Sequence, residues 1–140
     1  MIVTAEFICS TWVDSSIGKS KSRSSKLGTC FVYDHNGNYV EQIGEKGKKS
    51  DFKNLYKPSY IASDSNGDNV YIFDYNSKFY KINKYTRQNS TSYNFSNNHK
   101  VSKSVSCLRV DSYGNLMVAQ NTGANKPGIT VLDPEMQLIQ

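Results

Sequence analysis

The sequence predicts an all-β fold made of repeated units of four antiparallel strands. Aromatic residues are frequent, with ten Tyr and six Phe against one Trp, and such side chains favour strands. A segment of the chain recurs at a regular distance, and tetrads rich in Asn, Asp and Gly separate the apolar runs. With 140 residues, the chain is long enough for one domain of ordinary size.

The recurring segment defines the length of the unit. Residues 61–72 recur with changes as residues 108–118, so that Asp64 and Asp111 stand 47 positions apart. Asp34 and Asp133, which follow similar apolar runs, stand 99 positions apart, which is close to two such periods. A fixed period of this length is the mark of a repeat architecture.

Each unit divides into short strands joined by tight turns. In the middle unit we expect strands near 59–64, 69–74, 78–83 and 91–95. In the third unit we expect them near 105–111, 115–120, 128–133 and 136–140. The first unit lacks its first strand and keeps strands at 1–7, 29–34 and 38–43.

Tandem four-stranded units of this size are typical of β-propeller blades. Strands such as 70–73 are apolar on both faces, as expected for a blade that packs between two others. We therefore predict one partial propeller domain over 1–140, of about 2.75 blades, with blades at 1–44, 58–96 and 104–140. The alternatives are a single β-sandwich of about eleven strands and an open stack of three sheets.

The middle unit also carries the residues of a known repeat, in order. They are Pro58, Ile61, Ala62, Asp64, Gly67, Asn69, Tyr71, Ile72, Asp74, Asn76, Lys78, Phe79 and Ile82. At these positions the chain resembles the NHL-repeat family. The third unit keeps Asp111, Gly114 and Asn115 but has Val105 where the family has proline. The resemblance implies a propeller of about six blades, so we expect missing blades or self-association to complete it.

Positive charge collects at one end of the expected blades. The chain has 17 Lys and Arg against 12 Asp and Glu, a formal charge of +5. If the strands alternate in direction, the long loops lie at one end and the acidic turns at the other. The predicted binding residues on the long loops are Lys19, Lys21, Arg23, Lys26, Lys46, Lys48, Lys49, Phe52, Lys53, Tyr56, Lys57, Lys100 and Lys103.

A basic face with interleaved aromatic rings is typical of single-stranded RNA binding. The resemblance implies that the partner is either RNA or a protein, because NHL domains of tripartite-motif proteins bind either RNA or protein substrates. We therefore predict a non-catalytic binding module for a protein or for single-stranded RNA, in a tripartite-motif-like E3 ubiquitin ligase system. The alternatives are an extracellular or lumenal interaction propeller and a propeller enzyme with a metal in its central channel.

Other signals are weak. Gly18, Lys19 and Ser20 resemble the end of a phosphate-binding loop, but no helix pattern follows them. His35 and His99 fall at opposite ends of the blades, so we predict no metal site, no cofactor and no catalysis.

Cysteine content and hydropathy bear on location. Cys9 and Cys30 fall on neighbouring strands, where we expect buried thiols rather than a bond. We find neither an apolar run long enough for a membrane helix nor a secretory signal. A cytoplasmic protein without membrane contact is the expectation.

Overall fold

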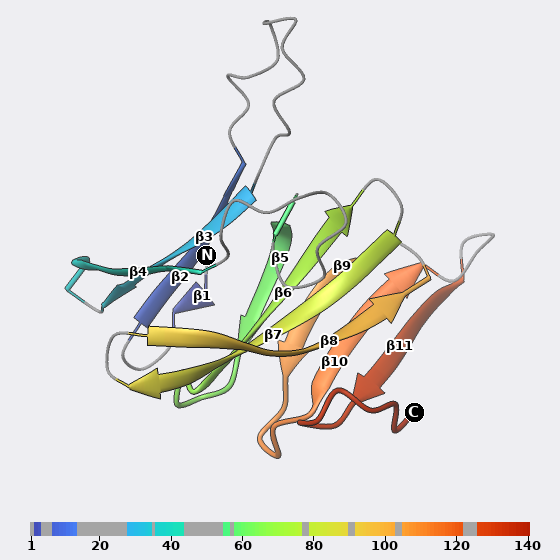
Figure 1. Cartoon of the computed structure of the whole chain (residues 1–140). Coiled ribbons are helices and arrows are strands. Elements are labelled where there is room, and N and C mark those ends of the chain that lie inside the picture. The colour runs from blue at the N-terminus through green and yellow to red at the C-terminus, as the bar shows by residue number, and fades with distance from the viewer. Residues whose placement is uncertain are drawn as a thin grey trace, which may run out of the picture.

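The computed structural model of the chain contains three antiparallel sheets arranged one after another (Figure 1). It describes residues 2–3, 7–13, 28–34, 36–43, 55–56, 58–76, 79–89, 92–102, 105–121 and 126–140. These residues form strands and turns and contain no helix, which confirms the all-β prediction. Accordingly, the described residues offer no helix that is long and apolar enough to cross a membrane.

The first sheet has four strands in sequence order. They are β1 (Ile2–Val3), β2 (Phe7–Val13), β3 (Gly28–Asp34) and β4 (Tyr39–Ile43). This differs from the expectation of three strands with the first at 1–7. The apolar start of the chain is divided into a two-residue β1 and a longer β2, which pairs with β3 along its whole length.

The second sheet is the longest and also follows sequence order. Its strands are β5 (Pro58–Ser63), β6 (Asn69–Asn76), β7 (Phe79–Asn89) and β8 (Ser92–Val101). The last two extend well beyond the expected 78–83 and 91–95. The residues at the ends of β7 and β8 are mostly polar, so the hydrophobic pattern of the sequence does not indicate a strand there. The backbone pairing of the two strands nevertheless continues from Tyr80 to Asn89.

The third sheet contains β9 (Val105–Val110), β10 (Leu116–Asn121) and β11 (Pro127–Leu132), in the order β11-β10-β9. The fourth strand expected at 136–140 is reduced to one bridge between Leu132 and Leu138. A tight turn, in which Met136 has a φ of 66°, returns the chain beside β11 without a regular ladder.

The second sheet is covered on both faces, as predicted for a propeller blade. Ile72 and Val70 pack against Cys30, Val32 and Ile43 of the first sheet. On the opposite face, side chains of the second sheet pack against the third sheet; the contacting residues are Tyr71, Phe73, Ile82, Leu108, Leu116, Val118 and Leu132. Three sheets with two cores between them exclude the single β-sandwich.

One buried ion pair lies in the core between the first and second sheets. Lys81 Nζ stands 3.6 Å from Asp74 Oδ2, and neither side chain is more than 1% exposed. The backbone N–H of Tyr56 donates a 2.8 Å hydrogen bond to the other oxygen of Asp74. Beside them, Asn83 Nδ2 donates to the hydroxyl of Tyr85 at 3.1 Å. Buried polar groups are tolerated where they are paired in this way.

The repeated Asp residues are explained by a shared turn. Asp64 accepts hydrogen bonds from the backbone and side-chain amides of Asn69, at 3.2 and 2.7 Å. Asp111 accepts the same two bonds from Asn115, at 2.8 and 3.0 Å. Gly67 and Gly114 have φ values of 71° and 85°, a conformation that favours glycine. The repeat therefore reflects turn geometry rather than an ion-binding loop.

The cysteines depart from expectation at one position. Cys30 is disulfide-bonded, which corrects the prediction of a free buried thiol there. The side chain of Cys9, the other residue of that expected contact, lies outside the described part of the chain.

Candidate functional site

Most of the predicted basic binding face lies outside the described residues. This applies to Lys19, Lys21, Arg23, Lys26, Lys46, Lys48, Lys49, Phe52, Lys53, Lys57 and Lys103. The structure describes Tyr56 and Lys100. The alternation of the strands follows the prediction, because the turns that hold Asp64, Asp111 and Asp133 all lie at one end of the sheets.

Tyr56 and Lys100 lie at the opposite end of the second sheet, where they were expected. The N–H of Tyr56 bonds to Asp74, and Lys100 pairs with Lys81 in the ladder between β7 and β8. Lys100 is therefore part of strand β8 and not of a long loop as predicted. Its Nζ lies 5.5 Å from the ring centroid of Phe79, within reach of a cation–π contact.

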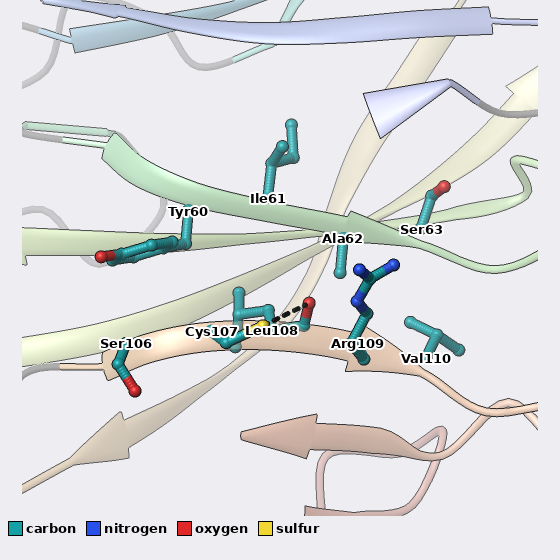
Figure 2. A pocket seen from close by; sticks show the side chains of 9 residues that line it. All are labelled: Tyr60, Ile61, Ala62, Ser63, Ser106, Cys107, Leu108, Arg109 and Val110. Atoms are coloured by element: carbon teal, nitrogen blue, oxygen red, sulfur yellow. Dashed lines mark hydrogen bonds between the residues drawn. The ribbon is translucent and has the colours of Figure 1, made fainter. Parts of the chain in front are cut away.

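A cleft between the innermost strands of two sheets is the most defined candidate site. β5 of the second sheet lies beside β9 of the third, and a cavity of about 300 Å³ runs between them. Its lining residues are Tyr60, Ile61, Ala62, Ser63, Ser106, Cys107, Leu108, Arg109 and Val110 (Figure 2). In a propeller the innermost strands of the blades surround the central channel. The cleft therefore lies in the wall of that channel.

Arg109 brings a positive charge into this cleft. Figure 2 shows its side chain reaching from β9 toward Ala62 and Ser63 of β5. An arginine stays protonated at every physiological pH. Within the described part of the chain, the guanidinium has neither an ion pair nor a hydrogen bond. The nearby carboxylate of Asp111 is instead occupied by Asn115.

The other polar groups of the cleft are small. Cys107 is a free, exposed cysteine whose Sγ donates only a long contact, at 3.7 Å, to the carbonyl oxygen of Leu108. The hydroxyl of Ser106 donates to the carbonyl oxygen of Ala119 at 3.2 Å. Tyr60 is 40% exposed and offers a further hydroxyl. One free guanidinium among hydroxyl groups is suited to a small polar anion or to a carbonyl that becomes one.

This cleft was not predicted from the sequence, because only the two histidines were considered as candidates for a metal site or for catalysis. The signal was present in residues 105–110, where Arg109 interrupts a strand that otherwise supplies Val105, Leu108 and Val110 to the core. A charged residue in an innermost strand points to a polar channel.

Comparison with known proteins supports the propeller. No family model matches the chain, and no curated protein matches it. A gluconolactonase from Xanthomonas campestris matches with a TM-score of 0.62 at 14% identity, over 95% of this chain and 42% of that chain. A putative gluconolactonase gives a TM-score of 0.65 at 15% identity, over 99% and 44%. The calcium-binding protein regucalcin from Agrobacterium tumefaciens gives 0.52 at 12%, over 85% and 38%.

These similarities show the fold and correct one prediction. The prediction of a protein without enzymatic activity is contradicted, because the solved structures that resemble the chain include gluconolactonases. The chain spans less than half the length of each of these structures. At such identities the similarity concerns the β-propeller in general and not the NHL type. The described residues thus form three blades of a β-propeller.

Proposed function

We propose that the chain contributes the channel wall of a propeller enzyme that hydrolyses a small polar lactone, such as a sugar lactone. The observation that carries this proposal is the free guanidinium of Arg109 in the cleft between β5 and β9. The similarity in fold to two proteins described as gluconolactonases supports the choice of substrate class.

The chemistry of lactone hydrolysis fits a cationic cleft. Water adds to the lactone carbonyl, the ring C–O bond breaks, and the hydroxy acid that forms releases a proton at neutral pH. The carbonyl oxygen becomes negative in the transition state, and the product is a carboxylate. A planar guanidinium can hydrogen-bond both anions. In this proposal Arg109 binds the substrate and stabilises the developing charge.

No step is assigned to a metal ion. One solved structure of similar fold is a calcium-binding protein. Among the described residues of this chain, however, no group of three or more His, Cys, Asp or Glu side chains could hold a metal ion. The donor set in the described channel wall thus does not fit a metal, and the proposal uses only the side chains of the cleft.

The direct test is hydrolysis of glucono-δ-lactone, followed by proton release and corrected for the spontaneous rate in buffer. We expect catalysed hydrolysis by the wild-type chain and a loss of about 10²-fold or more in Arg109→Leu. The matched control is Arg87→Leu, because Arg87 pairs with Asp68 at 3.1 Å, outside the cleft. A wild-type rate equal to the buffer rate would refute the proposal, as would equal rates in the two variants.

A second candidate function is binding at the basic end of the blades, to single-stranded RNA or to a protein. Its support in the described residues is the exposed Lys100 beside Phe79. Fluorescence anisotropy with short single-stranded RNA at two salt concentrations tests it. Affinity that falls with salt and in Lys100→Glu would favour RNA, and no binding would favour a protein partner. The tripartite-motif relationship, the ubiquitin ligase system and the cytoplasmic location stay predictions.

A further inference from the structure

An aromatic ring lies at one end of the cleft between β5 and β9. Tyr60 is 40% exposed, and its ring centroid lies 6.1 Å from that of Phe73, which is 2% exposed. Phe73 in turn stacks on Tyr80, with ring centroids 5.9 Å apart and ring planes inclined by 13°. The ring of Tyr75 lies 4.8 Å from that of Tyr80. These contacts hold the ring of Tyr60 in place and leave part of it open to a ligand.

The guanidinium of Arg109 lies near the other end of the same cleft (Figure 2). It reaches toward Ala62 and Ser63, and Ser63 stands three positions after Tyr60 in β5. A strand rises about 3.3 Å per residue, so the two ends of the cleft are separated by roughly 10 Å along β5. A single sugar ring is shorter than this distance. A lactone of one ring whose carbonyl lies at Arg109 therefore leaves the ring of Tyr60 without a contact.

The walls between the two ends offer backbone groups. Consecutive residues of both strands, 60–63 and 106–110, line the cleft. Successive side chains of a strand point to opposite faces, so the edges of β5 and β9 themselves border the cleft. Among the described residues, β5 pairs only with β6, and β9 pairs only with β10. An edge of this kind presents N–H and C=O groups that have no ladder partner, and such donors and acceptors suit the hydroxyl groups of a sugar.

We propose that the cleft takes a lactone that carries a second sugar ring, with the lactone carbonyl at Arg109 and the second ring against Tyr60. This inference rests on the lactone hydrolysis proposed above and names its substrate class. A sugar ring has an apolar C–H face and a rim of hydroxyls, which suits an aromatic ring beside two strand edges. Hydrolysis opens the ester of the first ring and leaves the bond between the two rings intact. Tyr60 is therefore a specificity-determining residue.

A binding test that needs no catalysis compares two stable product anions. Gluconate has no second ring, whereas lactobionate carries an intact galactose ring on the gluconate unit. By isothermal titration calorimetry, we expect lactobionate to bind the wild-type chain at least about tenfold more tightly than gluconate. Arg109→Leu should weaken the binding of both anions, because both carry the carboxylate. Equal affinities of the two anions for the wild-type chain would overturn the proposal.

Variants of Tyr60 assign the preference for lactobionate to its ring. Tyr60→Ala should remove the preference, and Tyr60→Phe should retain most of it. Tyr113→Ala is the matched control, because Tyr113 is 85% exposed on the turn between β9 and β10. Circular dichroism shows whether Tyr60→Ala is folded, and Tyr60→Leu replaces it if it is not. A folded variant that lacks the ring and keeps the full preference would refute the contact with Tyr60.

Steady-state hydrolysis separates this inference from the proposed function. Tyr60→Ala should raise the KM of lactobiono-δ-lactone about tenfold more than that of glucono-δ-lactone, and the difference should appear in KM and not in kcat. If lactobionate binds through Tyr60 and neither lactone is hydrolysed, lactone hydrolysis is refuted and the site for the second ring stands. If both lactones are hydrolysed with the same KM in the wild type and in Tyr60→Ala, hydrolysis stands and the second ring is refuted.

Discussion

The second and third sheets share a repeat in sequence but differ in how their faces are covered. In β6, neighbouring residues such as Ile72 and Phe73 are buried on opposite faces. In β10, Leu116 is buried while Met117 beside it is exposed. The same type of strand thus has two buried faces in the middle of the stack and one at its end.

This difference shows where the fold can accept polar groups. The fully buried ion pair of Asp74 and Lys81 lies in the covered second sheet, where the first sheet excludes water from it. The third sheet has its unpaired cation, Arg109, on a strand that borders the channel. The buried charges of Asp74 and Lys81 are therefore structural, and the charge of Arg109 on the inner edge is available to a ligand.

The largest effect is expected from breaking the buried ion pair. Lys81→Met should lower the free energy of unfolding by about 3–5 kcal/mol, because it leaves Asp74 buried beside no cation. Urea unfolding followed by circular dichroism measures this loss. The double variant Asp74→Asn/Lys81→Met should recover most of it. A loss below about 1 kcal/mol in the single variant would show that water reaches this core.

Two isoleucines, one in the covered second sheet and one on the exposed face of the third, test whether the two sheets differ in how their faces are covered. Ile72→Ala in the covered sheet should cost about 2–5 kcal/mol, because Ile72 is fully buried. Ile129→Ala on the uncovered face should cost less than about 0.5 kcal/mol in the monomer. Both are measured by urea unfolding at low protein concentration. Equal losses would mean that the far face of the third sheet is covered within one chain.

Alkaline pH should act mainly on the second sheet. Burial raises the pKa of Tyr71 to about 12, and nearby Asp64, Glu135 and Asp133 add to the effect. Burial likewise raises the pKa of Tyr93 to about 12, although Arg87 opposes it. Because these values lie above the unfolded value near 10, the stabilisation is complete below about pH 10 and is lost as pH rises toward 12.

Tyrosinate absorbance and unfolding midpoints, recorded between about pH 9 and 12, follow this loss. Tyr71→Phe should reduce the fall in stability over that range. The same fall in Tyr71→Phe as in the wild type would assign the alkaline loss to other groups.

The smallest effect on stability is expected from substitutions in the turn that follows the first strand of the second and third sheets. Desolvation raises the pKa of Asp111, but the hydrogen bonds from Asn115 and Tyr113 together outweigh it, so that the pKa is lowered. Asp111 therefore stabilises the fold above about pH 4, and this contribution is lost as pH falls through the lowered pKa. Asp111→Ala should destabilise less than Ile72→Ala, and the difference from wild type should shrink in acid.

Ser112→Ala in the same turn is the control, since Ser112 is exposed. Asp64→Ala should lower the stability about as much as Asp111→Ala, because each carboxylate accepts the same two bonds from an Asn, although the turn at Asp64 is one residue longer. Urea midpoints on either side of pH 4 measure both. A larger loss at Asp64 would show that coverage by neighbouring sheets also strengthens the turn.

The sequence was informative about blades and poor about the site, for physical reasons. Turn residues such as Asp64 and Gly67 are dictated by local backbone geometry, which a repeat reveals. The outer parts of β7 and β8 were missed because backbone pairing, not hydrophobic pattern, holds them together. The cleft with Arg109 depends on two strands more than forty positions apart lying side by side, and no local signal reports that distance.

Hydrogen exchange is the most direct test of the central claim, that the second sheet is covered on both faces and the third sheet on one. Amides of β6 and β7 should be the most protected. Amides of β10 and β11 should exchange faster, because one face of their sheet is exposed. Equal protection of the second and third sheets would contradict the claim.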